Sequence, residues 1–162
     1  MRSNSRRDPA LTMWATYLLA VTAAGFTGRL TGDNWNSKAQ GDKWGVVFYT
    51  DGSEGSLKSA TYWDRIMDEY GELDHVMLGK VDCVAERALC DHSGVNEFPA
   101  LRFGNPHMMK GAKGMHVYRN KFEYENLERF VGSYVERMGE IKKRKLEGKY
   151  KPPHPEHGHV EM

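Results

Sequence analysis

Cysteine is scarce in this 162-residue chain, and its scarcity excludes several kinds of chemistry. Only Cys83 and Cys90 are present, and the first half of the sequence has none. Two cysteines are too few for a disulfide-rich scaffold or for a zinc finger. Because the reactive species in thiol chemistry is a thiolate, any such chemistry would depend on these two residues alone.

The sequence also lacks an excess of charge of either sign. Its 23 lysines and arginines nearly balance 22 aspartates and glutamates, which leaves a formal net charge of +1. A balance this close to zero argues against a general nucleic-acid or polyanion binder, so we expect no nucleic-acid partner. No internal repeat is visible, and we expect neither a cofactor nor a bound metal. The length allows one domain with a hydrophobic core, but not two.

The longest stretch without charge, residues 9–28, follows three arginines near the N-terminus. A basic start, an apolar middle and small residues at the end have the form of a secretory signal. Ala23 and Gly25 have the spacing of a cleavage site. Alternatively, the stretch is a retained membrane anchor, because twenty residues of helix span about 30 Å, the thickness of the hydrocarbon layer. Both alternatives predict a protein of the secretory pathway or another organelle lumen, either membrane-anchored or secreted.

The rest of the chain alternates between strand-like and helix-like patterns. Residues 45–50 form a β-branched and aromatic run typical of a buried strand, and Trp63, Ile66 and Tyr70 recur on one helical face. The expected elements are a short strand and a helix or turn within 30–44, strands at 45–50, 75–83, 98–103 and 115–119, a helix at 57–70, a short helix ending at Gly94 and a last helix from Glu123. This order indicates an α/β fold with one central mixed sheet flanked by helices.

From Leu30 to Val135 the sequence resembles the thioredoxin-like domains of the protein disulfide isomerase family. The similarity consists of several short matches in the right order rather than one long motif. The matches are Phe48-Tyr49, Trp63 and Tyr70, Val81-Asp82-Cys83, the segment 98–104, and Tyr118, Tyr124, Leu127 and Phe130. The resemblance implies a thioredoxin fold, here with an N-terminal apolar helix and an extended C-terminal helix.

The resemblance ends at the residues that carry the family's chemistry. The family pattern Phe-Tyr-Ala-Pro-Trp-Cys-Gly-His-Cys-Lys aligns without a gap from Phe48 onward. The redox motif then falls on four consecutive residues, Ser53, Glu54, Gly55 and Ser56. A serine hydroxyl cannot form the mixed disulfide that a thiolate forms. The family's buried acid and its helper arginine fall on Val47 and Phe122, so the resemblance implies a domain that is not an enzyme.

Two further features follow from the same resemblance. Phe98-Pro99 matches the family's cis-proline loop, which receives extended polypeptides; alternatively, the fold needs this turn whatever the domain binds. Cys83 and Cys90 resemble a structural cysteine pair that some members have at this strand-to-helix junction. A disulfide between them is feasible, and the alternative is two reduced cysteines in the core, depending on the compartment.

The apolar stripe of the last helix continues beyond the point where the resembled fold ends. We therefore assign 1–29 to the signal or anchor, 30–137 to the thioredoxin-like domain, 138–150 to a basic helical extension and 151–162 to an irregular tail. We expect the domain to leave the extension uncovered and a protein partner to bind it. The expected partner-binding residues are Met138, Ile141, Lys142, Lys143, Arg144, Lys145 and Leu146.

These observations favour a redox-inactive protein-binding module, an accessory subunit of a membrane-associated assembly that contacts the membrane through 9–28 if that stretch is retained. The alternative is a non-catalytic chaperone or escort of the secretory pathway. A third hypothesis, oxidoreduction by Cys83 and Cys90, conflicts with their spacing, which does not fit a redox pair.

Overall fold

The computed structural model describes residues 26–39, 43–71, 73–109 and 111–151. Its five-stranded sheet has the order β1-β3-β2-β4-β5. The strands are β1 (Phe26–Arg29), β2 (Trp44–Thr50), β3 (Val76–Asp82), β4 (Ala100–Gly104) and β5 (His116–Val117). The first three run parallel, whereas β4 is antiparallel to β2 and β5 is antiparallel to β4. The sheet is therefore mixed, as expected.

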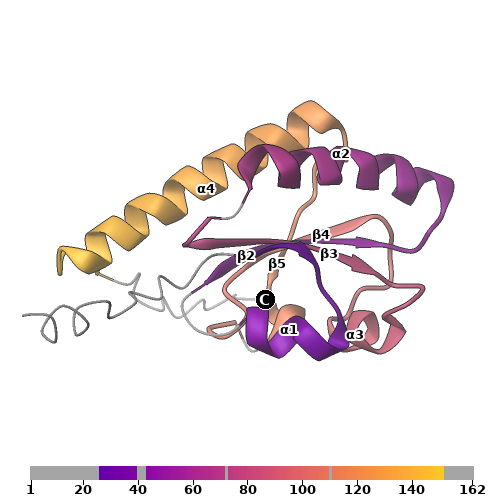
Figure 1. Cartoon of the computed structure of the whole chain (residues 1–162), viewed down its shortest axis with the longest axis horizontal. Coiled ribbons are helices and arrows are strands. Elements are labelled where there is room, and N and C mark those ends of the chain that lie inside the picture. The colour runs from indigo at the N-terminus through magenta and orange to yellow at the C-terminus, as the bar shows by residue number, and fades with distance from the viewer. Residues whose placement is uncertain (1–25, 40–42, 72, 110, 152–162) are drawn as a thin grey trace, which may run out of the picture.

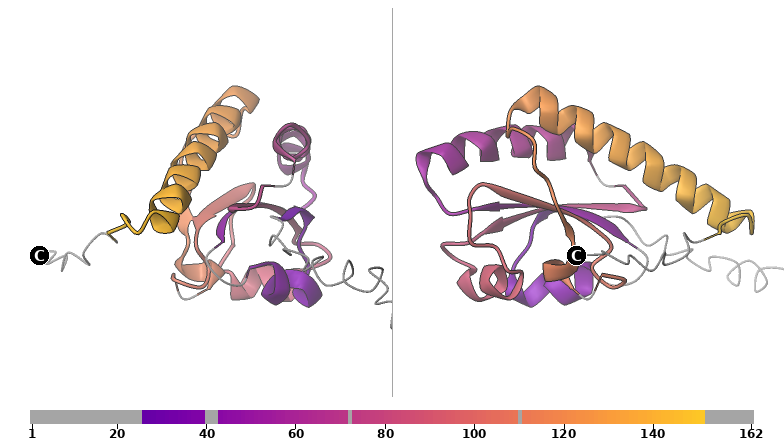
Figure 2. Two further views of the ribbon diagram at one scale, coloured as in Figure 1. Left: turned by 60° about the vertical axis from the view of Figure 1, so that its left-hand side comes forward. Right: turned by 180° about the vertical axis from the view of Figure 1, so that it is seen from behind.

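Helices cover both faces of the sheet (Figure 1). On one face lie α2 (Glu54–Tyr70) and α4 (Tyr124–Leu146), and on the other lie α1 (Gly32–Lys38) and α3 (Arg87–His92). A 3-10 turn, η2 (Ala112–Gly114), precedes β5. Figure 2 shows the same three layers from two other directions, with the sheet between the two pairs of helices.

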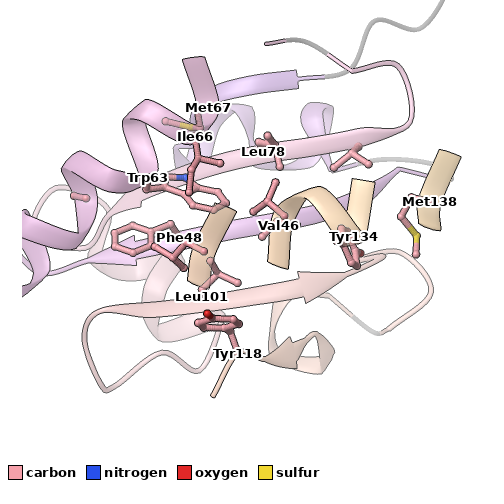
Figure 3. Close-up of a cluster of buried hydrophobic side chains, with 14 residues drawn as sticks. Val46, Phe48, Trp63, Ile66, Met67, Leu78, Leu101, Tyr118, Tyr134 and Met138 are labelled. Atoms are coloured by element: carbon pink, nitrogen blue, oxygen red, sulfur yellow. The ribbon is translucent and has the colours of Figure 1, made fainter. Parts of the chain in front are cut away.

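Strand β2 is buried on both faces because its side chains alternate between two apolar clusters. Val46 and Phe48 pack toward α2 and α4, whereas Val47 and Tyr49 belong to the cluster on the side of α1 and α3. Figure 3 shows the first cluster, in which the Phe48 and Trp63 rings stack with centroids 5.8 Å apart. The continuous apolar run of this strand therefore reflects its central position in the sheet.

The middle of β3 contains a glycine that the packing requires. A Cβ atom on Gly79 would lie 2.2 Å from Cδ1 of Leu30, which is fully buried just after β1. The carbonyl of Gly79 also accepts a 3.0 Å hydrogen bond from the indole N–H of Trp63. Leu30 and Trp63 thus approach the same strand residue, and only a residue without a side chain leaves room for both contacts.

The first strand begins earlier than expected, and the expected boundary at Leu30 is wrong. Phe26–Arg29 pairs with Met77–Lys80 of β3, so these four residues belong to the sheet and not to the N-terminal apolar segment. Thr31 is the N-cap of α1, where its hydroxyl accepts from the backbone N–H of Asn34. The pairing partner lies about fifty residues away in sequence, and no local pattern reveals it.

The predicted N-terminal apolar helix, as part of residues 1–25, and the irregular tail from 152 onward lie outside the described residues. Within the described ranges, no helix is both long enough and apolar enough to cross a membrane.

The C-terminal extension packs on the domain itself, contrary to our expectation for Met138. That side chain is only 4% exposed and lies in the same cluster as Tyr134 (Figure 3). Ile141 is half-buried against this cluster. Lys142 pairs with Asp74 in the loop before β3. Helix α4 is therefore part of the domain up to about Lys142, so the boundary at 137 is too early.

Candidate functional site

The turn between β2 and α2 lies where the sequence places the remnant of a redox motif. Gly52 has φ +79°, a conformation that favours glycine. Ser53 is the N-cap of α2, and its hydroxyl accepts from the backbone N–H of Ser56 at 3.4 Å. Ser53 is exposed and Ser56 is fully buried. Because the cap stabilises the first turn, α2 begins at Glu54 rather than at the expected Leu57.

The hydroxyls of this turn are held in a local hydrogen-bond network around Asp51. The carboxylate of Asp51 accepts from both the backbone N–H and the hydroxyl of Ser53, at 3.1 and 2.7 Å. Its own N–H donates to the Ser56 hydroxyl at 3.5 Å. Hydrogen bonds from Ser53 hold the pKa of the Asp51 carboxyl below its usual value. A carboxylate with a lowered pKa is a poorer base, so this pair is badly suited to activate Ser53 as a nucleophile.

The two cysteines form a disulfide directly beside this turn. Cys83 and Cys90 are bridged with a Cα–Cα distance of 5.8 Å, and the backbone N–H of Cys83 donates to the carbonyl of Thr50 at 2.8 Å. The expected bridge is therefore present. Both residues are almost fully buried, at 4% and 1% exposure. Because thiol–disulfide exchange needs access to a sulfur, this bridge is suited to linking β3 to α3 rather than to catalysis.

Burial also controls the ionisation of Tyr49, which belongs to the apolar cluster between the sheet and the helices α1 and α3. Tyr49 is fully buried, and loss of solvation raises the pKa of its hydroxyl to about 12. The hydroxyl therefore stays neutral at physiological pH, and Tyr49 contributes an uncharged ring to the core below the turn.

The Phe98–Pro99 peptide bond is cis, as the resemblance implies. Ala100 pairs with Tyr49 across the sheet, so Pro99 lies opposite the last residue of β2, at the edge of the sheet where the Ser53 turn begins. The sequence therefore identified both parts of one surface, although they are about forty-five residues apart.

A groove of about 430 Å³ lies next to Pro99. Its walls come from the loop before β4, from β4, from β5 and from the segment before α4. They are lined by Val95, Asn96, Glu97, Pro99, Ala100, Arg102, Val117, Tyr118, Arg119 and Phe122. Arg102 is held in place by donating to the carbonyl of Gly94 at 2.9 Å. The resemblance indicated a binding groove beside Pro99, but sequence reasoning missed its other lining residues, because they come from four segments with no common motif.

Two positions where the resemblance predicts charged groups are apolar in the structure. Val47 is fully buried in the cluster below β2. Phe122 contacts Phe48 and Tyr118 edge to ring, at centroid distances of 6.1 and 5.5 Å. Phe122 thus links the wall of the groove to the core. A charge without a partner at the fully buried position 47 would be strongly unfavourable.

The far end of α4 lies at the opposite edge of the sheet from this turn. There the His75 ring lies between two acceptors, with Nδ1 2.8 Å from an Asp74 carboxylate oxygen and Nε2 3.2 Å from the carbonyl of Val135. Lys142 contacts the same carboxylate. These bonds hold α4 against the loop that leads into β3.

Of the residues expected to bind a partner, those after Lys142 remain the candidates. Leu146 is 80% exposed, and Lys143 and Arg144 are exposed as well. Lys145 lies 5.4 Å from the ring centroid of Tyr150. The predicted surface therefore shrinks to the last turn of α4 and the residues that follow it.

Comparison with solved structures identifies the architecture. A J-Trx1 fragment of ERdj5 matches with a TM-score of 0.55 and 22% identity, over 67% of this chain and 51% of that one. The zinc-bound form of human ERp44 matches with a TM-score of 0.55 and 15% identity, over 67% and 31%. The first two thioredoxin domains of Naumovozyma dairenensis Eps1p match at 0.52 and 18% identity, over 65% and 40%.

These matches establish the thioredoxin fold for the present chain, as the sequence predicted. The chain spans about half of the ERdj5 fragment and about a third of the ERp44 chain. No known family profile matches the sequence. No curated protein matches it either.

Proposed function

We propose that this chain is a redox-inactive, thioredoxin-fold protein-binding module. The observation that carries the proposal is the first turn of α2, where Ser53 and Ser56 occupy the positions that the sequence resemblance assigns to two sulfurs. Ser53 caps the helix and Ser56 is buried. The two cysteines of the chain lie beside this turn but are joined to each other in a buried bridge. This arrangement supports binding without thiol chemistry.

The groove beside Pro99 is the proposed binding site. Its lining combines the apolar residues Pro99, Val117 and Phe122 with the charged residues Glu97 and Arg119. A concave surface of this size with a few polar groups is typical of a binding site. Among the described residues, β5 pairs with β4 alone and lies at the edge of the sheet, so its other side offers backbone groups to an extended segment. The occupant would be an extended polypeptide of a protein partner.

Two biological settings fit such a module. The first is an accessory subunit of a membrane-associated assembly, with one permanent partner. The second, an escort that holds unfolded clients for a time, is favoured specifically by the groove. The disulfide supports a location in an oxidising lumen, since such bonds are rare in reducing compartments.

The test of redox inactivity is an insulin-reduction assay with a built-in positive control. The rate of insulin reduction with the wild-type chain should not exceed the background rate. The S53C/S56C variant should form a thiol pair at the start of α2 and gain measurable activity. Activity in the wild type that disappears in C83S/C90S would overturn the proposal, because it would assign the chemistry to the bridge.

The test of the groove uses a permanently unfolded polypeptide with blocked cysteines as the probe. Binding measured by fluorescence anisotropy should weaken when V117W fills the groove. The matched control is M108W, which adds the same ring at an exposed position outside the groove. Equal binding by both variants and the wild type would exclude the groove as the binding site.

A further inference from the structure

The side of α4 that faces away from the domain carries a row of exposed polar residues. Figure 2 shows α4 on the outside of the molecule with α2 beside it. The buried side of the helix is formed by Leu127, Val131, Tyr134 and Met138. The opposite side, at the spacing of one helical face, carries the exposed residues Glu125, Arg129, Ser133, Glu136, Glu140 and Arg144. We call these residues the outer row of α4, and the described part of the chain leaves this row uncovered.

Four charged residues of the outer row do not pair with one another within the helix. Glu125 precedes Arg129 by four residues, and Glu140 precedes Arg144 by the same spacing. Opposite charges at this spacing are neighbours on a helix surface, and α2 and α3 each contain such an ion pair, with N–O distances of 2.8 and 3.1 Å. Among the residues that the structure describes, the four side chains of α4 make neither an ion pair nor a side-chain hydrogen bond. They are therefore available to another molecule.

The order of these four charges makes the outer row complementary to a second copy of itself. Along the chain the order is acid, base, acid, base, with Ser133 between the two halves. When two copies of α4 lie antiparallel about a twofold axis close to Ser133, Glu125 of each copy faces Arg144 of the other, and Arg129 faces Glu140. A twofold interface repeats every contact, so each pairing occurs twice. A parallel pair in register would instead place each charge against a charge of the same sign.

We propose that two copies of this chain associate through the outer rows of their α4 helices, as an antiparallel pair with twofold symmetry. The interface is polar and one helix wide, and exposed ion pairs contribute little each, so the dimer is weak and depends on protein and salt concentration. Such a dimer carries two copies of the groove beside Pro99. The inference does not depend on the binding function proposed for that groove.

Cross-linking of the full chain through one introduced cysteine tests this arrangement locally. Both native cysteines are paired and buried, so a cysteine introduced by S133C is the thiol that a short bis-maleimide reaches. Because position 133 lies close to the proposed twofold axis, this variant should give a covalent dimer. The matched control is S37C, an exposed serine on α1 at the other face of the sheet, which should stay monomeric. About 0.5 M salt should lower the yield of the S133C dimer, because it screens the charge pairs.

Charge exchange in the S133C background tests the pairing itself. R129E/R144E makes the four charges acidic, and E125K/E140K makes them basic. Each variant alone should associate roughly a hundredfold more weakly than the S133C parent, because every attractive contact becomes repulsive. A mixture of the two variants should form the covalent dimer again, since all contacts between unlike copies are attractive. One chain that carries all four substitutions restores the alternation and should dimerise by itself.

The matched charge control is K58E/K113E, which makes the same change in net charge as R129E/R144E at exposed positions outside α4 and should keep the yield of the S133C parent. Far-ultraviolet circular dichroism would confirm that each variant is folded. The proposal is overturned if S133C and S37C cross-link alike, if K58E/K113E loses the dimer as R129E/R144E does, or if mixing the acidic and basic variants does not restore it.

Discussion

Replacing Met138 by alanine tests whether the C-terminal part of α4 belongs to the domain. Met138 is 4% exposed and lies among core residues contributed by the sheet, α2 and the first half of α4. Truncating a buried methionine to alanine removes its transfer free energy and leaves a cavity, which together cost ~2–4 kcal/mol. For a chain of this length, that loss lowers Tm by roughly 2–4 °C per kcal/mol.

The matched control is Leu146→Ala, on the same helix two turns later. Leu146 is 80% exposed, so its truncation should change the free energy of unfolding by less than ~0.5 kcal/mol. Both variants would be unfolded in urea and followed by circular dichroism and tryptophan fluorescence. We expect a lower midpoint with an unchanged m-value for M138A and a midpoint like the wild type for L146A.

The reasoning would be refuted if M138A and L146A were equally stable. That result would mean that the second half of α4 does not pack on the free domain. It would instead favour the expectation from the sequence that a partner covers the helix from Met138 onward. Truncation after Arg137 gives a second measurement. It removes Met138, the half-buried Ile141 and the ion pair of Lys142 with Asp74, so it should destabilise the domain at least as much as M138A.

Three further predictions concern stability. C83S/C90S removes a bridge between two residues that are seven apart in sequence, so the free energy of chemical unfolding should fall by ~2–3 kcal/mol. An unchanged unfolding midpoint would mean that the bridge does not form in solution. Gly79→Ala should destabilise by ~1–3 kcal/mol through overlap with Leu30, whereas Gly55→Ala, whose added Cβ meets no atom within 4 Å, should be neutral or stabilising in thermal unfolding. Hydrogen bonds from Lys142 and His75 lower the pKa of Asp74, so this exposed carboxylate adds modestly to stability above the ordinary aspartate pKa near ~4. This gain is lost as the pH falls through the lowered pKa. D74N should therefore reduce the fall in the free energy of unfolding at acid pH, and the same fall in wild type and variant would contradict the role of Asp74.

The sequence alone determined the type of fold and the positions of several of its elements and turns. The buried run that forms β2 and the apolar stripe of α4 are visible locally, because each depends on side-chain periodicity. The cis bond at Pro99 was implied by the resemblance to the thioredoxin-like domains and not by the local pattern. The same resemblance implied the cysteine pair, with Cys83 just after β3 and Cys90 within α3, but it left open whether the two are bridged. The first-turn serines of α2 could be located because the alignment from Phe48 needs no gap.

The tertiary structure alone decided which surfaces are covered. Met138 and Leu146 lie on one continuing apolar stripe, yet Met138 is buried in the core cluster and Leu146 is 80% exposed. The contacts of the loop at Asp74 and His75 with α4 lie between Val135 and Lys142, before Leu146. Residues 26–29 have no strong strand pattern and are in the sheet because β3 offers them an unpaired edge. The groove beside Pro99 brings together four segments that are distant in sequence. Burial depends on what another part of the chain places opposite a residue, and the local sequence does not contain that information.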